Sequence, residues 1–236
     1  MPVRSRGREI ASPCLTLDLQ QGQGEGRGPE MVGTSSPNSP CLGCFLSFLN
    51  NAGPAMLVII LGPSGVGKSA AIKTLCEKNS WRPIISYVTR PEREDDLYKI
   101  SISSRSFQML SELDKLWSDV EQGGYRYGLL RSEIELAVAS SEVWIVDFAL
   151  SSWSKYFSAV DHLLISMQAE SDEALRQRLI DSSRSSRIDS SIASNAELND
   201  WIARGEQGVT LHQVINRTGS LSDAVAAIEL AVARKV

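Results

Sequence analysis

Met56 to Lys78 reads MLVIILGPSGVGKSAAIKTLCEK. Residues 56–62 form a continuous apolar run that ends in Gly and Pro, which indicates a strand buried on both faces. Residues 68–78 place Ala71, Ile72, Leu75 and Cys76 at helical spacing on one face. A buried strand, a glycine-rich turn and a helix are therefore expected to follow one another.

The turn, GPSGVGKS at residues 62–69, satisfies the pattern G-x-x-x-x-G-K-[ST] in the strand-to-helix context that phosphate binding requires. Its glycines let backbone N–H groups face phosphate oxygens, and the helix N-terminus adds a favourable dipole. Lys68 is expected to reach the β- and γ-phosphates, and the Ser69 hydroxyl to ligate Mg²⁺. ATP and Mg²⁺ are the predicted cofactors. The predicted ATP-binding residues of this segment are Gly62, Pro63, Ser64, Gly65, Val66, Gly67, Lys68, Ser69 and Ala70.

Strands and helices alternate after this segment, which predicts a parallel sheet covered by helices on both faces. The predicted strands are 56–62, 83–88, 142–149, 162–167 and 209–215, and the predicted helices are 68–78, 132–140, 171–183, 195–205 and 220–235. The fold class is α/β, a three-layer phosphate-loop NTPase fold with a five-stranded parallel sheet. Short polar-apolar pieces between residues 98 and 128 indicate a small inserted β subdomain over the carboxyl ends of the strands.

Residues 1–55 differ from the rest of the chain. They contain 8 Gly, 6 Pro and 6 Ser, and all the Trp and Tyr residues come later. With so little apolar surface to offset its ordering entropy, this segment is expected to be disordered. Met56 directly precedes a strong strand, so it is an alternative start. Three of the four cysteines fall in the segment, a usage that fits an intracellular, cytoplasmic protein.

Charge and hydropathy exclude two classes of partner. The chain has 24 basic and 28 acidic residues among 236, and its net charge of -4 opposes a sequence-independent grip on nucleic acid. No apolar run approaches the ~20 residues that cross a bilayer, so no membrane partner is expected. Oligomeric state stays open.

Other phosphate-loop classes lack their signatures here. A GTPase needs an Asn-Lys-x-Asp guanine reader and an Asp-x-x-Gly switch, but Phe148 follows Asp147 and Arg217 follows Asn216. A transport ATPase needs Leu-Ser-Gly-Gly, which is missing. The small size and the inserted subdomain favour a kinase that acts on a small phosphorylated acceptor.

GPSGVGKS together with IISYVTRPERE, residues 84–94, resembles the guanylate kinase family, and the resemblance covers about residues 56–235. That family has a Ser-x-x-Thr-Arg-x-x-Arg segment after the second strand, and here Ser86, Thr89, Arg90 and Arg93 reproduce it. Further matches are Tyr98, Tyr127-Gly128 and Asp147, which ends a predicted strand. The resemblance implies an acceptor-binding insert at about 90–130 and a helical lid at about 176–195.

Roles for further residues follow partly from chemistry and partly from this resemblance. Two arginines three residues apart can clamp a phosphate bidentately, and phosphoryl transfer needs positioning and charge neutralisation. The acceptor-binding residues implied are Ser86, Arg90, Arg93, Tyr98, Tyr127 and Asp147. The catalytic residues implied are Lys68, Arg90 and Arg178, the metal-binding residues are Ser69 and Asp147, and Asn216 is expected near the adenine.

The sequence departs from the family where the guanine base is read. Ser118 falls where a glutamate is usual, Leu129 replaces a Ser or Thr, and Ala149 replaces a second aspartate. Loss of these readers removes most of the polar groups that would penalise a wrong base. In the lid, Ser182 occupies an arginine position, while Arg184 and Arg187 are shifted along the chain.

Three hypotheses follow for function. The first is an ATP-dependent nucleoside monophosphate kinase of guanylate kinase type, with GMP or dGMP as acceptor. The second is a kinase for another phosphorylated acceptor, resembling ribose 1,5-bisphosphate phosphokinase through Thr89-Arg90-Pro91 and Arg126-Tyr127-Gly128. The third is a non-catalytic guanylate kinase-like binding module, which the intact Lys68 and Ser69 oppose. The acceptor stays open between them.

Overall fold

The computed structural model describes residues 56–94, 96–205 and 209–235. The expectation of disorder for residues 1–55 lies outside these ranges, as does the question of the start at Met56. No helix in the described ranges is long and apolar enough to cross a bilayer.

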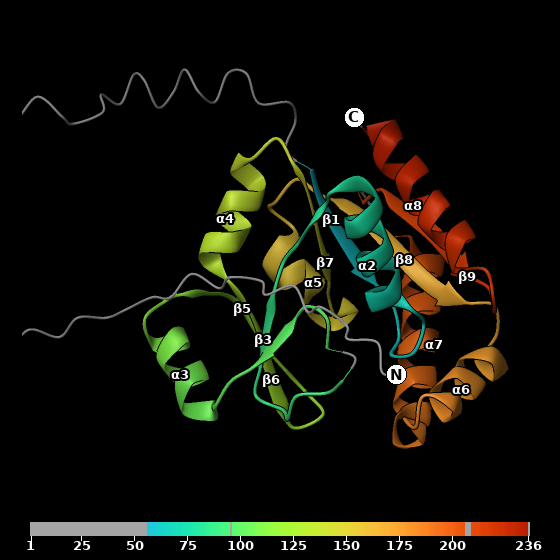
Figure 1. Cartoon of the computed structure of the whole chain (residues 1–236), viewed down its shortest axis with the longest axis horizontal. Helices are drawn as coiled ribbons and strands as arrows, with labels where there is room; N and C mark the ends of the chain where they lie inside the picture. The colour runs from blue at the N-terminus through green and yellow to red at the C-terminus, as the bar shows by residue number, and fades with distance from the viewer. Residues whose placement is uncertain (1–55, 95, 206–208, 236) are drawn as a thin grey trace, which may run out of the picture. The chain divides into compact units, whose positions relative to one another are not determined.

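Five parallel strands form the central sheet, as the alternating pattern predicted (Figure 1). In spatial order they are β2 (Arg82–Pro83), β7 (Val143–Asp147), β1 (Met56–Leu61), β8 (Leu163–Ala169) and β9 (Leu211–Asn216). Since parallel strands end at one edge of a sheet, the loop after β1 lies at the same edge as the last residues of β7 and β9. That edge is where a phosphate-loop fold binds its ligands.

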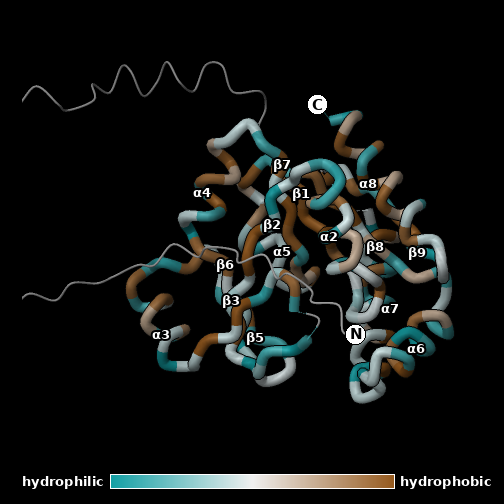
Figure 2. Tube along the Cα trace, in the orientation of Figure 1, coloured by the Kyte–Doolittle hydropathy of each residue, from teal (hydrophilic) through white to brown (hydrophobic). Residues whose placement is uncertain are grey.

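Both faces of the sheet are covered, which gives three layers. Val58 and Ile60 of β1 pack with apolar residues of α2 and α8, whereas Ile59 and Leu61 pack with those of α4 and α5. Figure 2 shows the hydrophobic character of the central strands, and all six residues of β1 are buried. The continuous apolar run, rather than an alternating one, follows from this burial on both faces.

The helices match the predicted ones, with two additions. They are α2 (Lys68–Asn79), α3 (Ser104–Glu112), α4 (Arg131–Ala139), α5 (Leu150–Phe157), α6 (Asp172–Asp181), the 3-10 turn η1 (Ser185–Arg187), α7 (Ile188–Arg204) and α8 (Leu221–Lys235). The sequence pattern did not indicate α3 or α5. The helix α7 begins earlier than the predicted start at residue 195, because serines and an aspartate, which weaken the helical pattern, fill its first turns.

The prediction of one strand over residues 83–88 is wrong. The chain leaves the parallel sheet after Ile84, whose N–H donates to Ile145 O at 2.9 Å. It then enters a second sheet as β3 (Ser86–Val88), where the Ser86 N–H donates to Tyr98 O at 3.0 Å. One apolar run therefore contributes to two sheets. Its hydrophobic pattern does not reveal that the chain pairs first with β7 and then with strands of the second sheet.

The second sheet spans residues 86–130, where the resemblance predicts the acceptor-binding insert, and is named the acceptor sheet after that prediction. Its strands lie in the order β4 (Lys99–Ser101), β3, β6 (Tyr125–Leu130) and β5 (Leu116–Gln122). Only β3 and β4 run parallel. The α3 helix begins with a Ser103 cap, whose hydroxyl accepts from the Ser106 N–H at 3.0 Å, and buries Phe107. In Figure 1 the acceptor sheet and α6 lie on opposite sides of α2 and its preceding loop.

Candidate active site

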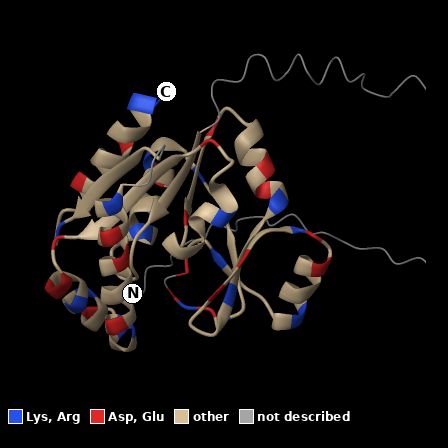
Figure 3. Cartoon of the chain, turned by 180° about the vertical axis from the view of Figure 1, so that it is seen from behind, with Lys and Arg blue, Asp and Glu red and all other residues tan. Residues whose placement is uncertain are grey.

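A cavity of about 540 Å³ is formed by the phosphate loop, the acceptor sheet and the segment around η1. Among the described residues, seven cationic side chains and two carboxylates line it. They are Lys68, Lys73, Lys99, Arg90, Arg93, Arg184, Arg187, Asp96 and Asp147. Elsewhere, acidic and basic residues are interspersed over the helices (Figure 3). The cavity thus concentrates positive charge within an acidic protein, as phosphorylated ligands require.

The phosphate loop is held by close backbone contacts that only glycine allows. A Cβ on Gly62 would lie 2.3 Å from Met167 O, and one on Gly67 would lie 2.5 Å from Asn216 Nδ2. Gly67 also has a φ of 102°, in the left-handed region. The same Asn216 amide donates to Val66 O at 2.8 Å. Strands β8 and β9 therefore fix the shape of the loop.

Lys68 bends back over this loop. Its Nζ donates to Gly62 O at 2.7 Å and to Pro63 O at 2.9 Å. Burial lowers the pKa of Lys68 to about 8, although Asp147 acts in the opposite direction. The ammonium is thus already placed at the loop, where two backbone carbonyls hold it.

Asp147, at the end of β7, is paired with a lysine that the sequence analysis did not identify. Lys99 Nζ lies 3.1 Å from both carboxylate oxygens. Burial would raise the pKa of Asp147, but Lys99 and Lys68 hold it below its usual value. The carboxylate is therefore ionised and faces two ammonium groups.

Arg90 and Asp96 form a buried ion pair beside the acceptor sheet. The two guanidinium nitrogens Nη1 and Nη2 each lie 2.5 Å from an Asp96 oxygen, and the side chains are 3% and 6% exposed. Arg90 Nε is buried without a hydrogen-bond partner. Asp96 was not among the predicted site residues, because its contact with Arg90 depends on the turn that brings the two side chains together.

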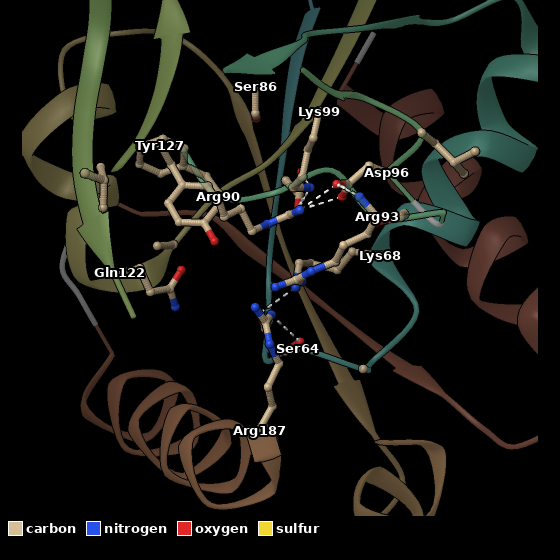
Figure 4. A pocket seen from close by; sticks show the side chains of 18 of the residues that line it. Ser64, Lys68, Ser86, Arg90, Arg93, Asp96, Lys99, Gln122, Tyr127 and Arg187 are labelled. Atoms are coloured by element: carbon tan, nitrogen blue, oxygen red, sulfur yellow. Dashed lines mark hydrogen bonds and ion pairs between the residues drawn. The ribbon is translucent and has the colours of Figure 1, made fainter. Parts of the chain in front are cut away.

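Arg93 and Arg187 approach the cavity from different walls and extend toward each other (Figure 4). Burial lowers the pKa of Arg93, and the positive charges of Arg187 and Arg90 lower it further. Arg187 Nη1 lies 3.4 Å from Ser64 Oγ of the phosphate loop. Two guanidinium groups brought together in this way favour an anion between them.

The structure brings most of the predicted site residues together. Those that line the cavity are Gly62, Ser64, Gly65, Gly67, Lys68, Ser69, Ala70, Ser86, Arg90, Arg93, Tyr127 and Asp147. Those that do not are Pro63, Val66, Tyr98, Arg178 and Asn216. Pro63 and Val66 are buried within the loop itself.

Two of the outlying residues have clear partners elsewhere. Arg178 Nη2 donates to Asn216 O at 2.7 Å and lies 3.3 Å from Thr218 Oγ1, at the end of β9. Tyr98 packs against the core on the α2 side, where burial and the neighbouring Cys76 raise its pKa to about 12. Arg184 and Arg187, which the sequence placed among shifted lid arginines, line the cavity instead of Arg178.

The three departures from the guanine-reading pattern all line the cavity. Ser118 and Leu129 are 1% and 2% exposed, and the Ser118 hydroxyl accepts from the Leu129 N–H at 3.3 Å. Gln122, which the sequence analysis did not identify, adds an amide to this wall. No side chain at these three positions carries a carboxylate that could accept from a base.

The donor set fits Mg²⁺ held mainly by a nucleotide. Ser69 and Asp147 both line the cavity and offer oxygen ligands, which this hard cation prefers. The part of the chain that the structure describes holds no cluster of three or more His, Cys, Asp or Glu able to bind a metal by itself. Mg²⁺ commonly takes one or two protein ligands and completes its shell with phosphates and water.

A family model of guanylate kinase matches residues 55–225. The chain belongs to the guanylate kinase family. It is 32% identical over 134 residues to a guanylate kinase of Polaromonas sp., which is 53% of this chain and 64% of that relative. It is 32% identical over 96 residues to one from Agrobacterium fabrum, 39% of this chain and 44% of that relative. The matches thus span less than two thirds of either relative.

A solved guanylate kinase structure supports the fold. The guanylate kinase of Anaplasma phagocytophilum superposes with a TM-score of 0.58 at 15% identity, over 78% of this chain and 87% of that chain. At this identity the likeness concerns the fold alone. It confirms the predicted α/β phosphate-loop architecture.

Proposed function

We propose that this chain transfers the γ-phosphoryl group of MgATP to a small phosphorylated acceptor, with GMP or dGMP as the acceptor that its family indicates. The observation that carries the proposal is one cavity in which the phosphate loop faces Arg93 of the acceptor region and Arg187 of the lid. A donor and an acceptor phosphate bound there would lie among the same cations.

The chemistry asked of the protein is positioning and charge neutralisation. Lys68 would leave the carbonyls of Gly62 and Pro63 and donate to the β- and γ-phosphates. Arg93 and Arg187, whose charges repel each other in the ligand-free cavity, would both donate to the phosphoryl group in transfer. When bound, Mg²⁺ would neutralise phosphate charge, with Ser69 and Asp147 as its protein-side oxygen donors.

Arg90 would act differently from Arg93. Its Nη1 and Nη2 already bind Asp96, and its Nε, which is buried without a hydrogen-bond partner, would donate to an acceptor phosphate. Tyr127 lines the same wall and would add a neutral hydroxyl. In this division Arg90 positions the phosphate of the acceptor, whereas Arg93 donates to the phosphoryl group that is transferred.

A coupled ADP-release assay tests the function and the acceptor together. GMP, dGMP, AMP, CMP, UMP and ribose 1,5-bisphosphate should be compared at equal concentration, with Lys68→Ala as the control for the active site. Turnover with GMP or dGMP is expected. The sugar phosphate is included because Ser118, Leu129 and Ala149 line the cavity without a base-reading carboxylate.

The remaining outcomes separate the three hypotheses. Turnover confined to ribose 1,5-bisphosphate would replace the nucleotide acceptor while keeping phosphoryl transfer. If no acceptor gives turnover although ATP binds, the chain is a binding module rather than a kinase.

A further inference from the structure

Lys99 ties the two sheets together across the cavity. It lies on β4 of the acceptor sheet, where it is the register partner of Ser86. Its side chain, 18% exposed, reaches the carboxylate of Asp147 at the end of β7 in the central sheet. Figure 4 shows Lys99 entering the cavity from the same wall as Ser86. One ion pair therefore joins the acceptor half of the site to the half proposed to bind MgATP.

The other charged groups of the cavity leave Lys99 few partners. Asp96, the second carboxylate among the described lining residues, is already bound by both Nη atoms of Arg90. Lys68 is bound by the loop carbonyls and would move to phosphate oxygens when a nucleotide enters. Among the described contacts, Asp147 is thus the carboxylate that Lys99 binds directly while the cavity is empty, and the charge of Asp96 acts on Lys99 without a direct contact.

The Asp147 carboxylate cannot bind both Lys99 and a divalent cation equally strongly. A divalent cation held by the phosphates of ATP attracts this carboxylate more strongly than one ammonium does. Once the Asp147 carboxylate binds this cation, Lys99 loses its directly bound carboxylate while its side chain remains largely buried. A buried ammonium needs a new anion, and the acceptor phosphate is the anion that enters next to the same sheet.

We propose that Lys99 couples the two halves of the site: it holds Asp147 in the empty cavity, is displaced when MgATP engages Asp147, and then binds the phosphate of the acceptor. The proposal rests on the proposed function for the identity of the two ligands. It makes Lys99 a positioning residue for the donor and a direct contact for the acceptor. Binding of MgATP and of the acceptor should then strengthen each other.

The donor half can be tested without any acceptor. The affinity for a non-hydrolysable ATP analogue is measured by calorimetry with and without Mg²⁺, and the ratio of the two dissociation constants is compared between variants. Lys99→Met removes the competitor for Asp147 but keeps the aliphatic stem, so Mg²⁺ should tighten binding about threefold more than in the wild type. Loss of one positive charge by itself weakens the binding of free ATP more than that of MgATP, so the ratio must be compared with that of a control variant that loses the same charge.

Two further variants make this measurement decisive. Lys99→Arg keeps the charge and should retain the wild-type ratio. Lys73→Met is the matched control, because Lys73 also lines the cavity but is 51% exposed and pairs only with Glu77 at 3.9 Å among its described contacts. An unchanged Mg²⁺ effect in a folded Lys99→Met protein, checked by its thermal transition, overturns the proposal.

The acceptor half uses GMP as the probe, with and without the Mg²⁺-bound analogue. In the wild type the analogue should tighten GMP binding, and in Lys99→Met most of that tightening should be lost while Lys99→Arg keeps it. Equal tightening in the wild type and Lys99→Met overturns the proposal. If GMP does not bind at all, the nucleotide acceptor is wrong, and the Mg²⁺ ratio alone decides the role of Lys99.

Discussion

Arg90 and Asp96 lie six residues apart and bind each other through two 2.5 Å contacts in an almost fully buried setting. Asp96 also accepts from the Arg93 N–H at 3.0 Å, so one carboxylate binds both the Arg90 side chain and the backbone of Arg93. Removal of one partner of such a pair costs more than the pair contributes, because it leaves a buried charge without compensation.

Asp96→Ala should therefore destabilise the protein by about 3–5 kcal/mol, measured by chemical denaturation. An anion can take the place of the lost carboxylate beside Arg90. Inorganic phosphate or GMP should accordingly raise the thermal transition of this variant more than that of the wild type. Glu92→Ala, which removes an exposed carboxylate of the same loop, is the control. Stability equal to the wild type would show that the buried pair is not needed.

The sequence identified those parts of the site whose residues are close along the chain. Gly62 to Ser69 and Ser86 to Arg93 each carry their chemistry in one short segment, and the structure brings both segments to one cavity. The parallel sheet could also be predicted from the sequence, because strands buried on both faces have continuous apolar runs.

Contacts between distant segments had no such signal. The Lys99–Asp147 pair joins residues separated by 48 positions, and nothing in the surrounding sequence marks Lys99 as facing the cavity. The change of sheet at Ile84 was hidden for the same reason, since a strand keeps its apolar pattern whichever partner it has. In the lid, spacing favoured Arg178, yet the turn after α6 brings Arg184 and Arg187 to the cavity.

The affinity for ATP should fall as pH rises through about 8. The pKa of Lys68 in the ligand-free protein is lowered from 10.5 to about 8, chiefly by burial, and only the charged form donates fully to phosphate oxygens. Above that pH, binding must first return a proton to Lys68, so the dissociation constant should rise about tenfold per pH unit until the pKa of the complex is reached.

Titration of the ATP analogue from pH 6.5 to 9.5, at saturating Mg²⁺, checks this expectation. Lys68→Arg supplies a group that stays charged throughout, so its profile should be flat even where its affinity is lower. A flat profile in the wild type would mean that Lys68 remains protonated in the empty loop.

Gly67→Ala should disrupt the phosphate loop. The new Cβ would lie 2.5 Å from Asn216 Nδ2, and the position has a φ of 102°. The strain and the broken Asn216–Val66 contact together should cost about 1–3 kcal/mol and abolish most ATP binding. Gly219→Ala is matched in backbone strain, with a φ of 77° and no atom within 4 Å of the new Cβ, so it should lose stability only. Normal ATP affinity in Gly67→Ala would contradict the close packing of the loop.

Arg187 and Arg178, both in the segment predicted to form a lid, should differ in which property of the protein they affect. Arg187 lines the cavity and lies 3.4 Å from Ser64 Oγ, so Arg187→Gln should lower kcat about 10- to 1000-fold by removing a charge that neutralises the phosphoryl group in transfer. Arg178 instead donates to Asn216 O at the end of β9. Arg178→Gln should cost about 1 kcal/mol of stability and leave kcat within a fewfold of the wild type.

We would measure steady-state kinetics and thermal transitions of both variants. A residue that contacts the reacting phosphate should lower kcat when it is replaced, whereas a residue that stabilises the end of β9 should lower only the thermal transition. A loss confined to KM for ATP in Arg187→Gln would indicate ground-state binding rather than transition-state stabilisation. The assignment reverses if Arg178→Gln loses kcat and Arg187→Gln does not. In that case α6 must move on ligand binding, because the Arg178 guanidinium would have to leave Asn216 and Thr218 to reach the cavity.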